Sequence, residues 1–535
     1  MLWKNSENGS VDTMAYPKIS KRTQYVVSAT AISACSVVIM NTLYGMNGVI
    51  RILPLALLIP MFALIITTER QKKGYDPKRL MNEAPTAIGM MAVKMMSGGS
   101  FDSAARDVAA NGPKYTSKLF SSAVKNVDLR ISIGMKECIN DAMASLHHDT
   151  APFRRSVMML SSASESKDEL ERKRMIKDAE TISLTGLREM SESYSSSLNS
   201  PCMLIFGLGV MVPMILMSVL PMLSIGGMFS VSMLDGTMVS FITLVAVPGI
   251  VAVVVISIIS NNPFMEKQSS KAEFVYILPM FSAFPVFVFS LLTFSDVPIS
   301  IFFAGLAAGI SGFVSIYPSV VKERKRSKTE EGFDHMLFEI GNRLLSGENF
   351  ETAMIVSLKA VKGMNVVTLL FERTLLLSKG DVRGTISSVL GPYSERVAQM
   401  YARIYESSLK DPRESGRLAI SLGHQVQDQT SVKKSIIGKL KSMMDMMTGT
   451  SAIFAPLIMG LSLVLLKPLS SISGAAVSSD VTVILMLYLI ELALLISVLT
   501  AYLGNKGGIV NVVHRFSMIL PVALVVFVSF SVLNI

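Results

Sequence analysis

The chain has 535 residues, of which half are hydrophobic and only 17% are charged. A soluble globular protein carries about 25% charged residues, and the apolar residues here form long uninterrupted runs, so a purely soluble chain is excluded. The net charge is +10, but Lys and Arg alternate with Asp and Glu and there is one Trp, so we expect no nucleic-acid partner. The positive excess is instead typical of a membrane protein that keeps Lys and Arg on the cytoplasmic side.

Most of the charges lie in two stretches of the chain. Residues 69–202 and 318–450 hold 20 Lys and Arg each, whereas the segments between them are apolar and nearly uncharged. Neither stretch shows a sustained alternation of β-branched residues, so we expect each to form an all-α bundle. The sequence therefore predicts an all-α membrane protein with two water-soluble helical domains.

An apolar run of ~20 residues is long enough to cross the hydrocarbon core of a membrane as a helix. A cytoplasmic N-terminus places both charged stretches and the basic short loops inside, whereas the inverted orientation would leave 40 Lys and Arg outside. We therefore expect a multi-pass protein of the cell membrane, with a retained signal-anchor and its C-terminus outside. The nine predicted spans are 25–45, 49–68, 203–225, 237–259, 275–293, 298–317, 451–470, 481–502 and 516–534. The predicted order is a cytoplasmic segment (1–24), two spans (25–68), a first cytoplasmic domain (69–202), four spans (203–317), a second cytoplasmic domain (318–450) and three spans (451–535).

A short motif occurs once in each charged stretch. Its two copies are Ser97-Gly98-Gly99-Ser100-Phe101-Asp102-Ser103-Ala104 and Ser346-Gly347-Glu348-Asn349-Phe350-Glu351-Thr352-Ala353. Each copy predicts a corner in which a left-handed glycine ends one helix and Ser100 or Asn349 caps the next. Asp102 and Glu351 then fall in the first helical turn, where the helix dipole favours a negative charge. Each phenylalanine is expected to fold back as an apolar anchor on the preceding helix.

The order of spans and domains also repeats. Two spans, a helical domain and two further spans form a unit that occurs twice in the same orientation, followed by a ninth span. A parallel repeat of this kind implies a pseudo-twofold axis along the membrane normal. Thr150 and Asp411, each followed by an early proline, predict the caps of two long helices that lead into the spans at 203 and 451.

The paired helical domains, each with a Ser-Gly-x-x-Phe-acid-Ser/Thr-Ala corner and each followed by a membrane span, resemble the type II secretion system F family. The two-repeat form is most similar to its archaeal branch, which serves the archaellum and other type IV pilus-like filaments. The resemblance covers residues 70–535. It implies a platform protein without catalysis of its own, whose cytoplasmic domains engage a hexameric secretion ATPase and whose membrane part guides pilin- or archaellin-like subunits. Assembly into a homo-oligomer and contact with membrane lipids also fit this resemblance.

Five residues are candidate contacts for partners or within the membrane. Glu491 falls in the middle of a predicted span, where a carboxylate costs about 2.5 to 3.5 kcal/mol, so it is expected to meet a polar partner or an incoming subunit. Arg324 and Arg326 belong to a basic run directly after the span 298–317, which suits anionic lipid or a docking ATPase. Arg172 and Arg174 belong to a mixed-charge helix face that a cytosolic motor could grip.

Other chemistry is not indicated by the sequence. We expect no catalytic residues, no cofactor and no metal ion, because no phosphate-binding glycine loop is present. The adjacent His147 and His148 lack further ligands nearby, so they do not form a zinc spacing. Two alternatives stay open, namely a transporter or channel built from two parallel repeats, and a membrane scaffold or receptor for cytosolic proteins.

Overall fold

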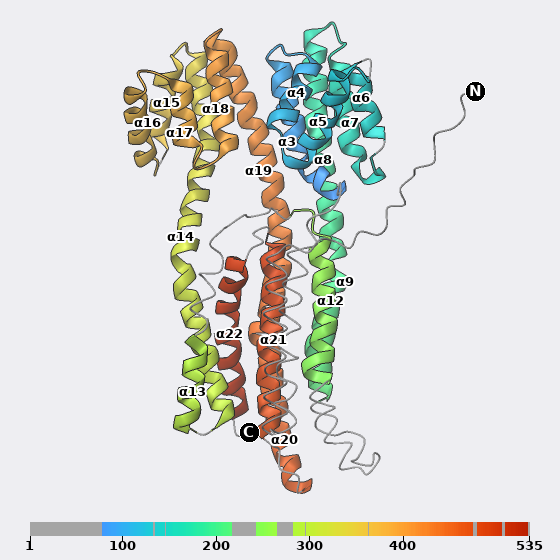
Figure 1. Ribbon diagram of the computed structural model, residues 1–535, viewed down its shortest axis with the longest axis vertical. Helices are drawn as coiled ribbons and strands as arrows, with labels where there is room; N and C mark the ends of the chain where they lie inside the picture. The colour runs from blue at the N-terminus through green and yellow to red at the C-terminus, as the bar shows by residue number, and fades with distance from the viewer. Residues whose placement is uncertain are drawn as a thin grey trace, which may run out of the picture.

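In the computed structural model, the structure is described for residues 77–131, 134–144, 146–216, 242–264, 282–294, 296–361, 363–473, 479–504 and 509–532. Every regular element in these ranges is a helix, which confirms the all-α prediction for this part of the chain. The helices form two polar blocks at one end of an elongated molecule and a bundle of apolar helices below them (Figure 1).

The first block closes around one hydrophobic core. Its helices are amphipathic, and they bury one face each, with Ile88, Phe120, Phe153 and Leu160 among the fully buried side chains. Burial of apolar area of this kind is the main force that holds short helices together, because isolated helices of this length are marginal in water. The block consists of α3 (Pro77–Met96), α4 (Phe101–Asn111), α5 (Lys114–Asp128), α6 (Met135–Ala144), α7 (Ala151–Ala163) and α8 (Glu169–Ser197).

The second block has its own core, around Phe333, Ile340, Phe371 and Tyr401. The buried Tyr401 hydroxyl donates a 2.6 Å hydrogen bond to the carbonyl oxygen of Phe333, so its polar end is satisfied. The block consists of the end of α14 (Val297–Leu345), α15 (Phe350–Ala360), α16 (Asn365–Leu377), α17 (Val382–Leu390), α18 (Glu395–Ser408) and α19 (Pro412–Gly449).

Within the residues that the structure describes, six helices are long and apolar enough to cross a membrane, which indicates a multi-pass membrane protein. They lie at Glu169–Leu216, Ile242–Ser260, Val297–Lys322, Pro412–Val464, Val481–Leu503 and Val510–Ser531. In the helices that begin at Glu169 and Pro412, only the C-terminal part is apolar, and the N-terminal part belongs to a polar block. These six segments include α9 (Asn199–Phe206), α12 (Val247–Ser260), α20 (Ala455–Ser473), α21 (Ser479–Leu503) and α22 (Ile509–Val532), and the bundle also contains the shorter α13 (Ala283–Phe294).

Six of the nine predicted spans therefore coincide with a helix that can cross a membrane. The predicted span 275–293 coincides with the shorter helix α13, whose described part starts at Ala283. The predicted spans 25–45 and 49–68 lie outside the described residues.

Two long helices connect the blocks to the bundle without a break. Helix α14 has 49 residues, of which the first half is apolar and the second half belongs to the second block. Helix α19 has 38 residues and continues through a π-helical turn (Thr450–Phe454) into α20. These two helices pack against each other within the second block, where Gly341 on α14 meets Gly416 on α19, and both continue into the bundle (Figure 1).

The length predicted for one helix is wrong. Thr150 opens α7, as its sequence suggests, but α7 ends at Ala163 and does not lead into the membrane. A new helix, α8, starts after Asp168, whose side chain accepts a hydrogen bond from the Leu170 amide. Asp is one of the residues preferred at a helix N-cap, so the sequence around Asp168 already indicates this helix start. The prediction for Asp411 is correct, because it caps α19.

Candidate interface between the two helical blocks

The two copies of the glycine motif form the same kind of corner. Gly98 and Gly347 have φ angles of +85° and +88°, the left-handed region in which a side chain is disfavoured. The amide that follows each glycine reaches back five residues, from Gly99 to Lys94 O at 2.9 Å and from Glu348 to Arg343 O at 3.1 Å. This is the Schellman arrangement, which satisfies carbonyl groups that a helix end leaves open.

The residues after each glycine lie as expected, with one exception. Ser100 accepts a hydrogen bond from the Ser103 amide, but the side chain of Asn349 makes no capping hydrogen bond. Asp102 and Glu351 occupy the first turn of α4 and α15. The serines that precede the glycines bond within their own helices, Ser97 to Lys94 O and Ser346 to Asn342 O. The side chains that anchor the two corners are buried, namely Phe101 and Ala104 in the first block and Phe350 and Ala353 in the second.

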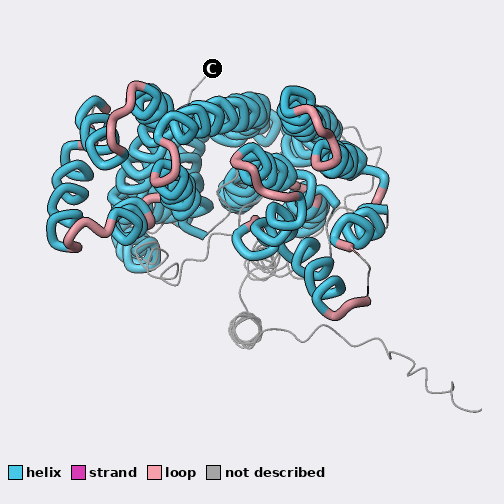
Figure 2. The backbone as a smooth tube through the Cα atoms, turned by 90° about the horizontal axis from the view of Figure 1, so that it is seen from above, coloured by secondary structure: helices cyan, strands magenta, loops and turns pink. Residues whose placement is uncertain are grey.

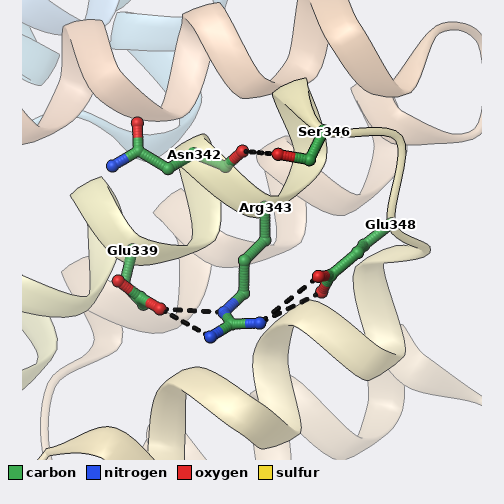
Figure 3. Close-up of polar contacts among 5 residues, drawn as sticks. All are labelled: Glu339, Asn342, Arg343, Ser346 and Glu348. Carbon is green, nitrogen blue, oxygen red and sulfur yellow. Dashed lines mark hydrogen bonds and ion pairs between the residues drawn. The ribbon is translucent and has the colours of Figure 1, made fainter.

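An ion-pair network at the second corner was not foreseen from the sequence. The Arg343 guanidinium lies between two carboxylates and donates to Glu339 at 2.9 Å and to Glu348 at 3.3 Å (Figure 3). Glu339 is one helical turn before Arg343, and this i, i+4 spacing is a signal that could have found the pair. The network connects the last turns of α14 with the loop that leads to α15.

The blocks lie side by side and touch (Figure 2). Arg403 on α18 forms a 2.8 Å ion pair with Asp107 on α4, and their side chains are only 25% and 15% exposed. Gln429 on α19 donates a 3.2 Å hydrogen bond to the carbonyl oxygen of Pro85 on α3. Val93 of the first block is buried in the core of the second. The blocks therefore share a specific interface and do not merely lie close together.

A cleft of about 420 Å³ opens at this interface. Its walls come from α3, from the turn between α4 and α5, and from α18 and α19. Gly89 lies at one wall, where the amide of Gln425 occupies the space that any larger side chain would need. The interface residues Arg403, Gln425 and Gln429 were absent from the candidates because their partners are hundreds of positions away in the chain.

The candidate arginines do not converge on one site. Arg172 and Arg174 lie on α8 of the first block, where Arg174 is exposed and Arg172 is half-buried. Arg324 is exposed on α14, directly after the apolar part of that helix. Arg326 follows on the same helix, and its side chain lies outside the described residues.

Glu491 is buried in the apolar bundle, where only 2% of its surface is exposed. One carboxylate oxygen, Oε2, has no hydrogen-bond partner among the described residues. Its neighbour Tyr488, three residues earlier on α21, donates a hydrogen bond to Gly209 O in a π-helical turn (Gly207–Met211). The side chain of Lys467, which belongs to the predicted span 451–470, lies outside the described residues.

The local role of His147 is visible. It accepts a hydrogen bond from the Asp149 amide and lies 3.3 Å from the Asp149 carboxylate, so it caps the short turn before α7. Among the described residues, no group of three or more His, Cys, Asp or Glu side chains is arranged to hold a metal ion.

The ion pair between the blocks yields a first prediction. Arg403→Ala is expected to lower the free energy of unfolding by about 2 kcal/mol, because it leaves the mostly buried Asp107 without its charged partner. The matched control is Arg383→Ala, since Arg383 pairs with Glu406 at 71% and 47% exposure and such a pair contributes at most about 1 kcal/mol. The measurement is denaturant unfolding of the purified protein. Equal losses in the two variants would contradict the assigned role of Arg403.

A second prediction concerns pH. Glu180 lies on α8 in the first block, ahead of the apolar part of that chain segment, and burial together with the nearby Asp428 raises its pKa to about 7. The folded state therefore holds a proton that the unfolded state releases near pH 4.5, so stability falls as the pH rises from 4.5 to 7. The decrease in the free energy of unfolding amounts to about 1 kcal/mol per pH unit. Glu180→Gln is expected to remove it. The free energy of unfolding of both proteins is measured from denaturant curves at about pH 5 and about pH 8. If the variant loses as much stability between these pH values as the wild type, Glu180 is not the titrating group.

Comparison of the chain with family models, with curated proteins and with solved structures finds no match.

Proposed function

We propose that this protein is a non-enzymatic membrane platform for the assembly of an archaellum or type IV pilus-like filament. In this proposal the two blocks are cytoplasmic and bind a hexameric secretion ATPase, while the apolar helices receive pilin- or archaellin-like subunits. The proposal includes the nine-span topology, the parallel repeat, the N-terminus inside and the C-terminus outside. It assigns the protein no cofactor and no nucleic-acid partner.

The observation that carries the proposal is the connection of the blocks to the bundle. Helices α14 and α19 run from the second block into the apolar region without interruption. The first block is joined to the bundle in the same way through α8 and α9. Because a helix is stiff over this length, a force on either block would tilt or rotate the attached membrane helices.

The contact between the blocks adds to this argument. The ion pair of Arg403 with Asp107 and the hydrogen bond of Gln429 to Pro85 join the blocks at their helical faces. Lys439 on α19 also pairs with Glu192 on α8 at 2.8 Å, close to the point where both helices approach the bundle. A motor that grips one block would therefore move the other as well, which suits a mechanical platform.

The apolar helices support a transporter less well than a platform. A transport pathway needs polar residues along the spans, whereas the buried Ser497 and Thr500 on the same helix as Glu491 donate to carbonyl oxygens of that helix. The carboxylate suits a contact within the bundle or with the helix of an incoming subunit. A scaffold that binds cytosolic proteins without moving a substrate is the other alternative, and it needs no continuous connection of blocks and spans.

The test is deletion of the gene in its own host. Filaments are expected to disappear, while the filament subunits are still processed to their mature length, because the platform acts after processing. Re-expression of the wild-type chain should restore the filaments. Pull-down from detergent extracts should recover a hexameric ATPase. Unchanged filaments in the deletion strain would overturn the proposal, and solute flux in liposomes containing the pure protein would favour the transporter instead.

A further inference from the structure

The cleft between the two blocks contains a buried amide without a partner among the described residues. Gln425 on α19 lines the cleft, is only 9% exposed, and makes no hydrogen bond with any residue that the structure describes. Its Nε2 atom occupies the space that a Cβ atom at Gly89 would need. Burial of a carboxamide without a hydrogen bond is unfavourable. The donor and the acceptor of Gln425 are therefore available to a molecule bound in the cleft.

Arg403 brings further donors to the same cleft. Its ion pair with Asp107 uses a single nitrogen, Nη2, which lies 3.0 Å from Oδ1 and 2.8 Å from Oδ2 of the carboxylate. A guanidinium has five N–H donors, so others remain for a ligand. Hydrogen bonds from arginine to phosphate are among the strong ones. Among the described residues that line the cleft, Arg403 alone carries a formal charge, which suits a ligand with one anionic group.

The apolar lining of the cleft comes from both blocks. Met90 and Val93 lie on α3 of the first block, and Met400 and Leu422 lie on α18 and α19 of the second. Methionine sulfur makes favourable contacts with aromatic rings, so a flat aromatic ring suits the space between Met90 and Met400. The volume of about 420 Å³ also lies within the range of small-molecule sites, which is about 300 to 1,000 Å³.

From these observations we propose that the cleft between the blocks binds an adenine nucleotide with a single phosphate group. The base lies between Met90 and Met400. The carboxamide of Gln425 pairs with the edge of the base, because adenine presents an N–H donor beside a nitrogen acceptor and glutamine matches both. The phosphate lies at Arg403. A triphosphate is matched less well, since neither a second cation nor a phosphate-binding glycine loop lines the cleft.

The bound nucleotide joins the two blocks. Met90 belongs to the first block, whereas Met400, Arg403 and Gln425 belong to the second. A ligand that contacts both sides stabilises the arrangement in which the blocks touch, because it binds that arrangement more tightly than a separated one. The site is regulatory, and no bond of the nucleotide is broken there. The inference goes beyond the platform function and does not depend on it.

Equilibrium dialysis of the detergent-purified full chain tests the class of ligand. Radiolabelled adenosine monophosphate is expected to bind saturably, with one molecule per chain. Adenosine is expected to bind about tenfold more weakly, because it lacks the phosphate that Arg403 contacts. A cleft that holds only water binds neither, so the absence of saturable binding at millimolar nucleotide overturns the proposal. Equal binding of adenosine and adenosine monophosphate also overturns it.

A pair of matched variants tests the place of binding. Gln425→Met keeps the size of the side chain but removes its donor and acceptor, so the affinity for adenosine monophosphate is expected to fall about tenfold. Gln427→Met is the control, because Gln427 is exposed on the same helix and does not line the cleft. Unfolding midpoints without nucleotide separate a lost contact from a lost fold. Equal affinities of the two variants overturn the proposal.

A change of base preference is the sharpest test. Gln425→Glu replaces a group that donates and accepts by a carboxylate that only accepts. Guanine presents two adjacent N–H donors, so this variant is expected to bind guanosine monophosphate more tightly than adenosine monophosphate, the reverse of the wild type. Misfolding cannot produce such a gain. If the variant does not fold, the comparison of Gln425→Met with Gln427→Met decides. A folded variant that still prefers adenine overturns the proposal.

Discussion

Replacing Gly416 by valine is expected to destabilise the second block by about 3 kcal/mol, because it inserts side-chain atoms between two helix backbones. Gly416 lies where α19 crosses α14. A Cβ atom at this position would lie 2.7 Å from Gly341 O and 2.8 Å from Leu345 N, both main-chain atoms that no rotamer change can move. The reciprocal position, Gly341, is equally tight, with Ile420 Cγ1 at 2.6 Å. The two helices that join the block to the bundle would be forced apart.

The same helix provides the control for Gly416. Gly438 is also within α19, but a Cβ atom there has no neighbour within 4 Å. Gly438→Ala is therefore expected to raise stability by about 0.5 to 1 kcal/mol through helix propensity alone. Denaturant unfolding in detergent measures both variants. Hydrogen exchange at α14 and α19 should accelerate only in Gly416→Val. Similar stability of the two variants would contradict the close crossing.

The second large effect is expected at the crossing of α14 and α22 inside the apolar bundle. Gly305 and Gly309 form a small-xxx-small pair of the kind that lets membrane helices approach closely. A Cβ atom at Gly305 would lie 2.3 Å from Leu524, and one at Gly309 would lie 2.2 Å from Pro521. Gly309→Leu is therefore expected to displace α22 and to lower the stability of the bundle by about 3 kcal/mol.

Gly249 on α12 is the matched control within the bundle, since a Cβ atom there has no neighbour within 4 Å. The measurement is the temperature at which the detergent-solubilised protein aggregates. Gly309→Leu should lower this temperature by several degrees, whereas Gly249→Leu should leave it nearly unchanged. An equal decrease in both variants would mean that a leucine is disfavoured for reasons other than the contact with α22.

Much of the local structure could be predicted from the sequence. The apolar runs predicted the helices of the bundle, and six of the predicted spans coincide with helices that can cross a membrane. The glycine corners were predicted correctly at Gly98 and Gly347, because left-handed backbone geometry selects glycine wherever it occurs. The failures were local as well. Asn349 does not use its side chain as a cap. The helix that leads toward the span at 203 is α8, which starts after the cap Asp168 and not after Thr150.

The candidate site was less predictable. The residues singled out for charge, such as Arg174 and Arg324, are exposed and lie on separate blocks. The residues that join the blocks were not among them, because Asp107 and Arg403 are ordinary charged residues 296 positions apart. Their pairing depends on how two finished helical blocks lie against each other.

By itself, the amino-acid sequence determined which segments are helical, which are apolar enough for a membrane and where glycine turns end the helices. These properties follow from the energies of short stretches, since helix capping, backbone strain and transfer into lipid depend on neighbouring residues. Only the tertiary structure decided that Gly341 meets Gly416, that Arg403 meets Asp107 and that the leucines of α16 stay exposed. These depend on distant residues whose contacts form when whole helices pack, and a local pattern carries no information about which helix will be the neighbour.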